Sequence, residues 1–188
     1  MAYRYSPSPF YNERPQNTTP DLIVIHAISI PDGEFHSDYI ESLFLGTITQ
    51  HNLSCNKELA NLEVSSHFVI DRQGNITQFV PLRMRAWHAG ESSWQGRSNC
   101  NDYSIGIELI GDQRTPFTSK QYSSLTQLCQ QLMHHFPQIT QERIVGHQEI
   151  APTRKWDPGV QFDWHLLRKM INHIHETPQS PIDAESWV

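Results

Sequence analysis

The sequence predicts an α/β (α+β) fold, a single domain in which helices flank a central mixed β-sheet. Short runs rich in Ile, Val and Leu alternate along the chain with segments whose apolar residues recur at steps of three and four. The first pattern is typical of buried strands and the second of amphipathic helices, so their alternation indicates a layered domain of sheet and helices. A chain of 188 residues buries roughly 70% of its unfolded surface, so its core needs neither disulfides nor a structural metal.

We expect the chain to divide into an arm, a domain and a tail. Residues 1–20 contain four prolines and little periodicity, which favours an extended N-terminal arm laid over the domain. Residues 21–175 carry the periodic segments and form the domain. Residues 176–188 contain two prolines and three acidic residues and are expected to be a loose C-terminal tail.

The first predicted strand covers residues 22–28 and carries His26 near its end. Its apolar, β-branched composition suits a strand that is buried on both faces. A Pro-Asp-Gly turn at 31–33 follows, and the apolar pattern over 39–44 predicts a short helix that Gly46 ends. These segments supply the first strand and the first helix of the domain.

A loop and a hairpin come next. Residues 47–64 are polar and irregular, and we expect a long surface loop there, of a length that is often functional in compact domains. Two β-rich runs, 66–71 and 76–80, are joined by a Gly/Asn turn over 72–75. This arrangement predicts a β-hairpin.

A second buried strand and the longest helix follow. Residues 103–110 are apolar except for small residues and one acid, Glu108. Thr118 or Ser119 can cap the N-terminus of a helix whose apolar residues recur as far as residue 136. A short strand over 143–147, which ends in a histidine, and a closing helix over 164–174 complete the domain.

The composition excludes several classes of function. Fourteen basic residues against twenty acidic ones give a net charge of −6, and no run of Lys or Arg is present. A nucleic-acid-binding surface would be basic, so we expect no nucleic-acid partner. Three cysteines without a C-x-x-C pair predict free thiols in a reducing compartment, and Cys129 falls on the apolar face of the predicted helix.

The hydropathy pattern bears on location. The N-terminus has no apolar leader segment, and no run approaches the ~18 apolar residues of a membrane-spanning helix. We therefore expect a cytoplasmic protein that is neither exported nor attached to a membrane.

Polar residues at the ends of apolar strands mark the candidate site. His26, Glu108 and His147 meet that description, and burial of such groups needs a partner that offsets their desolvation. Two neutral imidazoles and one carboxylate make a three-ligand zinc site with an open fourth position, which is the arrangement of catalytic zinc. Glu108 or Asp157 can supply the carboxylate, while ordinary hydrogen-bonded histidines are the alternative.

Several other chemistries lack their motifs. The chain has no H-E-x-x-H, and His147-Gln-Glu149 matches the H-x-E of zinc deaminases without the P-C-x-x-C that accompanies it. A G-x-S-x-G elbow and a Gly-rich phosphate loop are also absent. A serine hydrolase of that type and nucleotide chemistry are therefore disfavoured.

Several multi-residue motifs stand between about Pro7 and Trp164. They are Leu22-Ile-Val-Ile-His26, Arg85-Ala-Trp-His-Ala-Gly90 with Ser92-Ser93 and Gln95-Gly-Arg97, Cys100-Asn-Asp-Tyr-Ser-Ile-Gly-Ile-Glu-Leu109, and Gly146-His-Gln-Glu-Ile-Ala-Pro152 with Arg154-Lys-Trp-Asp-Pro-Gly159. In type and order these motifs resemble those of the AmpD-type N-acetylmuramoyl-L-alanine amidases. That family shares its fold with peptidoglycan recognition proteins and phage amidases.

The resemblance implies a catalytic site. By position, His26, His147 and Asp157 hold one Zn²⁺ per chain, Glu108 faces the zinc-bound water, and Lys155 lies beside the scissile carbonyl. Family members of this cytoplasmic type cleave the amide between the lactyl group of 1,6-anhydro-N-acetylmuramic acid and L-alanine in recycled muropeptides. A muropeptide is therefore the expected substrate, and we expect the enzyme to act as a monomer.

Three further residues are expected to bind substrate. Trp87 offers a flat apolar wall for a sugar ring, with ordinary core packing as the alternative. His88 can form a hydrogen bond with the substrate, and Arg97 lies in the same group of motifs.

Two other functions share these motifs. A peptidoglycan-binding module of the same fold does not cut its ligand, but such modules lose a zinc ligand and all three are present here. An amidase that acts on intact cell wall shares every catalytic residue. The chain also departs from the family's pattern at four positions, which are expected to alter the mouth of the site and the binding of the stem peptide: Ala27, Glu63, Asn99 and Trp156.

Overall fold

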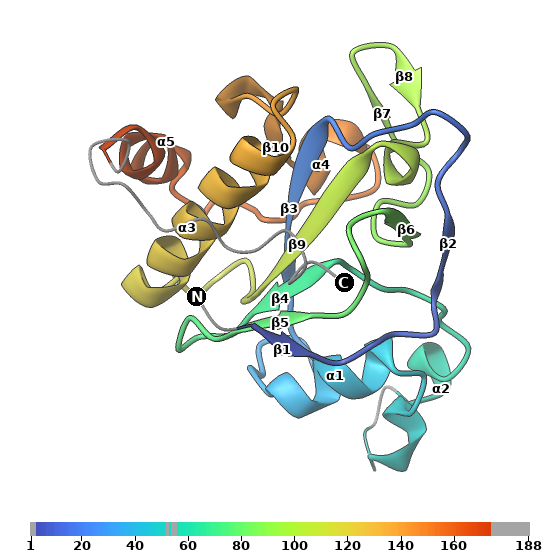
Figure 1. Ribbon diagram of the computed structural model, residues 1–188. Helices are drawn as coiled ribbons and strands as arrows, with labels where there is room; N and C mark the ends of the chain where they lie inside the picture. The colour runs from blue at the N-terminus through green and yellow to red at the C-terminus, as the bar shows by residue number, and fades with distance from the viewer. Residues whose placement is uncertain (1–2, 52, 54–55, 174–188) are drawn as a thin grey trace.

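A six-stranded mixed β-sheet forms the centre of the protein in the computed structural model (Figure 1). The structure describes residues 3–51, 53 and 56–173. In spatial order the strands are β1 (Arg4–Tyr5), β5 (Ile76–Gln78), β4 (Phe68–Ile70), β9 (Ser104–Ile110), β3 (Leu22–Ile28) and β10 (Ile144–Gly146). All neighbours run parallel except β4 and β5, which form the predicted antiparallel hairpin. The predicted α/β fold with a mixed sheet is confirmed.

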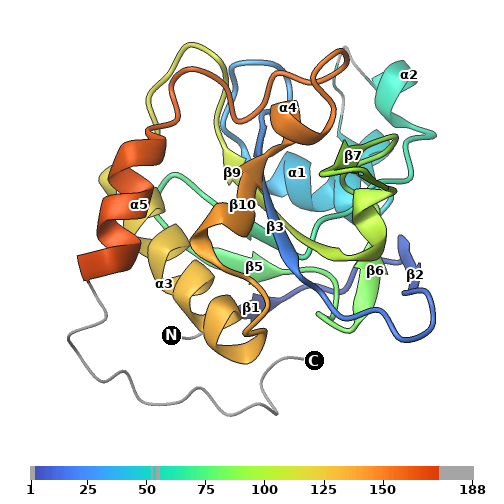
Figure 2. The same cartoon turned by 90° about the horizontal axis from the view of Figure 1, so that it is seen from above.

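Helices cover both faces of this sheet. Helices α3 (Ser119–His135) and α5 (Trp164–His173) lie together on one face, and α1 (Ser37–Phe44) lies on the other (Figures 1 and 2). Alternate residues of a strand point to opposite faces, so Ile23 and Ile25 of β3 pack with the cluster that α3 and α5 complete. The intervening positions of β3 face the side that carries α1.

Two helix ends follow from the local sequence. Thr118 caps α3 by accepting from the backbone N–H of Gln121, whose side chain accepts in return from the backbone N–H of Thr118. This capping box identifies Thr118, of the two residues expected, as the cap. Helix α1 ends before Gly46, whose φ of 72° is a conformation that favours glycine.

The described part of the N-terminal segment, residues 3–20, is held against the domain. Strand β1 pairs with β5, and β2 (Tyr11–Glu13) pairs antiparallel with β6 (Met84–Ala86). The guanidinium of Arg14 donates to four backbone carbonyls, those of Leu82, Asn101, Asp102 and Ser104. Hydrogen bonds of a charged group are among the strong ones, so the half-buried Arg14 fixes the segment to the backbone at Leu82 and at residues 101–104.

The expectation of an irregular loop over 47–64 is wrong in part. The segment contains a 3₁₀ turn, η1 (Ile48–Gln50), and a short helix, α2 (Asn56–Leu59), and Ile48 is buried beside α1. Single turns carry too few residues to show a periodic pattern. For the same reason the sequence does not predict α4 (His147–Ile150), which follows β10 directly. The remaining elements are β7 (Ser93–Trp94), β8 (Arg97–Ser98), η2 (Cys100–Asp102) and η3 (Gln141–Arg143).

Two expectations fall on residues that the structure does not describe. Residues 176–188, expected to be a loose tail, and Cys55 lie outside the described part of the chain. Within that part, no helix is both long enough and apolar enough to cross a membrane.

The buried thiol of Cys129 is expected to contribute to packing and not to chemistry. The thiols of Cys100 and Cys129 are free and buried, and burial raises the pKa of the Cys129 thiol to about 12. A thiol that stays protonated at neutral pH is a poor nucleophile. We expect Cys129→Ala to leave kcat and KM unchanged and to lower Tm by roughly 2 to 4 °C, the effect of about 1 kcal/mol in a domain of this size. Thermal unfolding and steady-state kinetics check this, and a large loss of kcat in the folded variant would assign the thiol a chemical role.

Candidate metal centre

Strand register brings the first two candidate residues together. His26 on β3 is the direct partner of Glu108 on β9, so both side chains project from the same face of the sheet. On the other side of β3, Gly146 of β10 pairs with Ile25. His147 follows Gly146 immediately as the first residue of α4 and therefore lies next to His26.

Asp157 approaches this pair from the loop after α4. Its backbone carbonyl accepts from the N–H of Gln148, which ties the loop to α4. A Cβ on Gly146 would lie 2.8 Å from Cδ of Pro158, so the absence of a side chain at Gly146 lets the 157–158 segment pack against the end of β10. The close packing holds the carboxylate of Asp157 beside His147.

Three donor atoms form a small triangle at this point. His26 Nδ1 and His147 Nδ1 are 2.9 Å apart, and each lies 3.1 Å from Oδ2 of Asp157. The three residues expose 1%, 3% and 6% of their surfaces, so water competes little for these atoms. In the described part of the chain they are the group of His, Cys, Asp and Glu residues whose geometry suits a metal ion.

The triangle fits zinc. Zinc takes nitrogen and oxygen ligands at about 2.0 to 2.2 Å, and two ligands of one tetrahedral ion at that distance lie about 3.3 Å apart. The observed separations of 2.9 to 3.1 Å are close to this value. Two imidazoles and one carboxylate are a donor set that zinc accepts, and three protein ligands leave a fourth position open.

Burial and neighbouring groups set the protonation states of His26 and Asp157. Burial lowers the pKa of His26 to about 4, although the Asp157 carboxylate, 3.1 Å away, opposes this effect. Burial would raise the pKa of Asp157, but the two imidazoles, each 3.1 Å from its Oδ2, outweigh this effect and lower that pKa below its usual range. At neutral pH the site therefore presents a neutral His26 imidazole and an ionised Asp157 carboxylate, the protonation states in which these residues bind metals.

Glu108 stands beside the triangle without joining it. Its Oε1 is 3.9 Å from Nδ1 of His26, and its Oε2 is buried with no hydrogen-bond partner among the described residues. Burial, followed by the negative charge of Asp157, raises the pKa of Glu108 well above its ordinary value. A buried carboxyl with an unused oxygen and a raised pKa is suited to accept and return a proton.

Lys155 contributes a positive charge to the same region. It lies two residues before Asp157, and its backbone N–H donates to the carbonyl of Ala151. Its ammonium is near enough that its charge lowers the pKa of both Glu108 and His26. The position suits an interaction with negative charge that develops near Glu108.

Trp87 and Arg97 make their contacts outside the triangle. The ring of Trp87 stacks on Phe10 with centroids 6.3 Å apart, and its Nε1 donates to Asn12. Arg97, on β8, pairs with Asp21 and places its guanidinium 3.6 Å from the centroid of the Tyr103 ring. Their expected roles in substrate binding stay predictions.

His88 contacts the triangle directly. Its Nδ1 is 2.9 Å from Nε2 of His26, and its Nε2 is 3.1 Å from the hydroxyl of Ser104. Next to it, the carbonyl of Ala89 accepts from Nε2 of His147 at 3.0 Å and from the guanidinium of Arg154. Ser104, Ala89 and Arg154 stand within the motifs quoted above, but the sequence indicates no role for them, because their partners depend on how distant segments pack.

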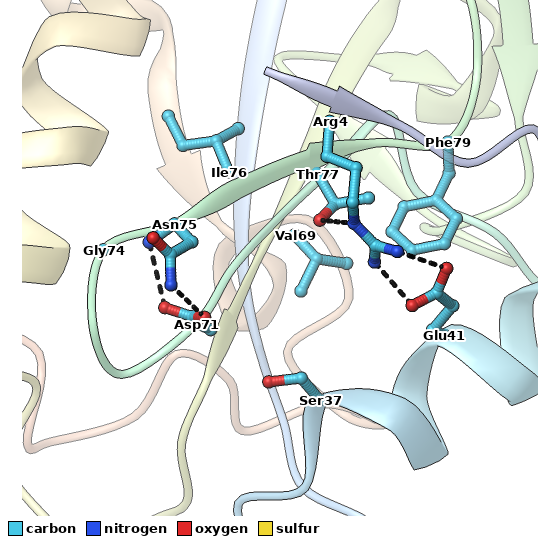
Figure 3. A pocket seen from close by; sticks show the side chains of 10 residues that line it. All are labelled: Arg4, Ser37, Glu41, Val69, Asp71, Gly74, Asn75, Ile76, Thr77 and Phe79. Atoms are coloured by element: carbon cyan, nitrogen blue, oxygen red, sulfur yellow. Dashed lines mark hydrogen bonds and ion pairs between the residues drawn. The ribbon is translucent and has the colours of Figure 1, made fainter. Parts of the chain in front are cut away.

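A separate cavity lies at the other edge of the sheet. It has a volume of about 540 Å³ and is lined by residues of β1, α1, β4 and β5 and by the turn between β4 and β5 (Figure 3). Its charged groups already have partners, since Arg4 is paired with Glu41, and Asp71 accepts from the side-chain amide of Asn75. No residue of the triangle lines this cavity, so the cavity is separate from the candidate active site that the triangle and its neighbours form.

Comparisons with known proteins show the family to which the chain belongs. The family described as N-acetylmuramoyl-L-alanine amidase matches residues 16–160. The 1,6-anhydro-N-acetylmuramyl-L-alanine amidase AmpD of Escherichia coli (strain K12) is 46% identical over 172 residues, which cover 92% of this chain and 93% of that protein.

Two solved structures of amidases are also similar to this chain. A crystal structure of an AmpD derivative matches with a TM-score of 0.86 at 46% identity and covers 90% of this chain and 94% of its own. The complex of AmiD from E. coli with anhydro-N-acetylmuramic acid-L-Ala-D-gamma-Glu-L-Lys matches with a TM-score of 0.62 at 28% identity, covering 93% of this chain and 71% of its own.

Proposed function

Because the chain belongs to the N-acetylmuramoyl-L-alanine amidase family, we propose that His26, His147 and Asp157 hold one zinc ion at which this chain performs the family's reaction. The resemblance of its motifs to AmpD-type enzymes is confirmed. The protein is an amidase of peptidoglycan recycling that hydrolyses the bond between 1,6-anhydro-N-acetylmuramic acid and L-alanine. The observation that carries the zinc proposal is the triangle of two imidazole nitrogens and one carboxylate oxygen, each about 3 Å from the others.

The residues around the triangle have separate roles in this proposal. Zinc, when bound, supplies a Lewis acid that lowers the pKa of a coordinated water toward about 7 and polarises a carbonyl. Glu108 accepts the proton of the attacking water, whose oxygen bonds to the carbonyl carbon of the lactyl group. Glu108 then passes that proton to the nitrogen of L-alanine as the C–N bond breaks. The unused Oε2 of Glu108 supports this assignment.

Lys155 acts on the carbonyl oxygen of the same bond. As water adds to the carbonyl carbon, the oxygen gains negative charge, and the ammonium of Lys155 stabilises that charge. In a buried site such a donor contributes more than it would in water, because fewer water dipoles screen it. The influence of Lys155 on the pKa of Glu108 and His26 supports its proximity to the reacting atoms.

Three further proposals concern the residues that contact the substrate, the oligomeric state and the compartment. We propose that a muropeptide with an anhydro-sugar binds with its sugar near Trp87, and that Arg97 also contacts the substrate, as predicted from the sequence. We further propose that the enzyme acts in the cytoplasm, a reducing compartment with which the free thiols of Cys100 and Cys129 agree, and that it acts as a monomer. Sedimentation and cell fractionation test these two points.

The reaction is tested with two substrates and one measurement. The zinc-loaded protein is incubated with a soluble 1,6-anhydro-muropeptide and, separately, with intact sacculi, and the products are identified by mass. We expect free peptide with an N-terminal L-alanine from the muropeptide and little release from sacculi. Release from sacculi at a similar rate would assign the enzyme to intact cell wall, and binding without any cleavage would make it a recognition module.

Zinc should also stabilise the folded chain. A ligand that binds only the folded state at 100 times its Kd adds about 2.7 kcal/mol, which raises Tm by roughly 5 to 11 °C in a domain of this size. We expect this rise when zinc is added to chelator-treated protein, and a folded state that persists after chelation because the core is extensive. His147→Ala is the control and should lose the rise. An equal rise in that variant would place the metal elsewhere.

A further inference from the structure

Both histidines of the triangle form hydrogen bonds with the adjacent residues His88 and Ala89. His26 Nε2 lies 2.9 Å from Nδ1 of His88, and His147 Nε2 lies 3.0 Å from the carbonyl of Ala89. A carbonyl can only accept, so Nε2 of His147 carries a hydrogen, and in the form of the ring that binds a metal Nδ1 keeps its lone pair. His147 thus presents a lone pair to the triangle.

The direction of the bond between His26 and His88 follows from a second carbonyl. The hydroxyl of Ser104 lies 2.5 Å from the carbonyl oxygen of Cys100, and it must donate there because the carbonyl can only accept. With its hydrogen used in this way, Ser104 accepts at its oxygen from Nε2–H of His88, 3.1 Å away. A neutral imidazole has one N–H, so Nδ1 of His88 carries a lone pair.

The tautomer of His26 is then determined. Nδ1 of His88, being an acceptor, takes the hydrogen bond from Nε2–H of His26. Nδ1 of His26 is left with a lone pair, and this atom is a corner of the triangle. A chain of three hydrogen bonds, from His26 through His88 and Ser104 to the Cys100 carbonyl, therefore orients the His26 ring for a metal.

The position of His88 is built into the fold. A Cβ on Gly106 would lie 2.5 Å from Cγ of His88, so the glycine on β9 makes room for this ring. The side chain of Asn101 accepts from the backbone N–H groups of both His88 and Ala89, at 3.1 and 2.8 Å. Packing and hydrogen bonds thus fix the ring whose Nδ1 faces His26.

We propose that His88 is a positioning residue which, anchored through Ser104 to the Cys100 carbonyl, holds His26 in the tautomer and orientation that bind zinc. This inference rests on the proposed zinc site, and the expectation that His88 contacts the substrate is the alternative that the experiment separates from it. Partners of metal-binding histidines of this kind typically change metal affinity or activity by 10- to 100-fold when they are removed.

Two isosteric substitutions separate the hydrogen bond from the shape of the side chain. Leu and Asn have the same branched outline, but only Asn places an acceptor where Nδ1 of His88 lies. We expect His88→Leu to weaken zinc binding by roughly 10- to 100-fold, measured by competition with a chelating dye on protein shown to be folded. His88→Asn should retain most of the affinity, and its cobalt(II) complex should keep the visible absorption spectrum of the wild type.

Each other result overturns the proposal. Equal weakening in both variants would show that only the volume of the ring matters. Wild-type zinc affinity in both variants, with a raised KM at saturating zinc, would make His88 a substrate contact. A wild-type protein that binds no zinc would instead contradict the proposed function, so the two failures are distinguishable.

Ser104→Ala tests the same chain of hydrogen bonds if His88→Leu does not fold. It removes the acceptor that fixes the tautomer of His88 and leaves the imidazole in place. We expect a loss of zinc affinity of about 10-fold, the low end of the range for such partners. Unchanged affinity would show that the Ser104 hydroxyl does not set the orientation of His26.

Discussion

Replacing Glu108 by Gln is expected to lower kcat by roughly 10²- to 10⁴-fold and to leave zinc affinity close to that of the wild type. Gln has the shape of Glu but cannot accept a proton from water and return it. The structure keeps Glu108 out of the triangle, at 3.9 Å from the nearest imidazole nitrogen, so its replacement removes none of the three donor atoms. Metal analysis and steady-state kinetics on a soluble anhydro-muropeptide measure the two effects separately.

A matched variant controls for the loss of a negative charge near the site. Glu91 is exposed and lies in the segment that follows the Ala89 carbonyl, so Glu91→Gln should leave kcat within about twofold of the wild type. Loss of zinc in Glu108→Gln would make Glu108 a ligand. An unchanged kcat would exclude it from proton transfer.

Removal of the Lys155 ammonium has the second-largest expected effect. An interaction made mainly with charge that develops in the transition state lowers kcat and kcat/KM together, whereas one made equally with the substrate raises KM alone. We expect Lys155→Ala to lose roughly 10²- to 10³-fold in kcat, as for a single donor to an oxyanion, with a modest change in KM.

Another lysine provides the control for this measurement. Lys169 on α5 is exposed, so Lys169→Ala should not alter either constant. A raised KM with an intact kcat would make Lys155 a residue that binds the ground state. Unchanged constants in Lys155→Ala would mean that it is a solvated charge or serves only to pair with Asp157.

The sheet could be predicted because its strands are strongly patterned. Residues 22–28 and 103–110 are apolar runs long enough to identify, and the structure forms β3 and β9 from them. The short helices α2 and α4 could not be predicted, because four residues show no helical period. The pairing of β3 with β9 places His26 opposite Glu108. Because these two residues are 82 positions apart, local sequence patterns do not predict that pairing.

The site could be predicted only as a set of candidate residues. Polar residues at the ends of buried strands indicated His26, Glu108 and His147, but the residues alone left the carboxylate of the site open. The structure brings Oδ2 of Asp157 to 3.1 Å from both imidazoles and keeps Glu108 at a greater distance. Hydrogen bonds that join distant segments, such as that between His26 and His88, depend on tertiary packing and leave no pattern in the sequence.

The central claim is tested most directly by locating the metal. Crystals of the zinc-loaded protein, measured on both sides of the zinc absorption edge, give an anomalous difference map in which zinc alone changes. We predict one peak per chain at about 2.0 to 2.2 Å from Nδ1 of His26, Nδ1 of His147 and Oδ2 of Asp157, with Glu108 outside bonding distance. A peak at any other group of residues, or no peak in a crystal grown with excess zinc, would contradict the account.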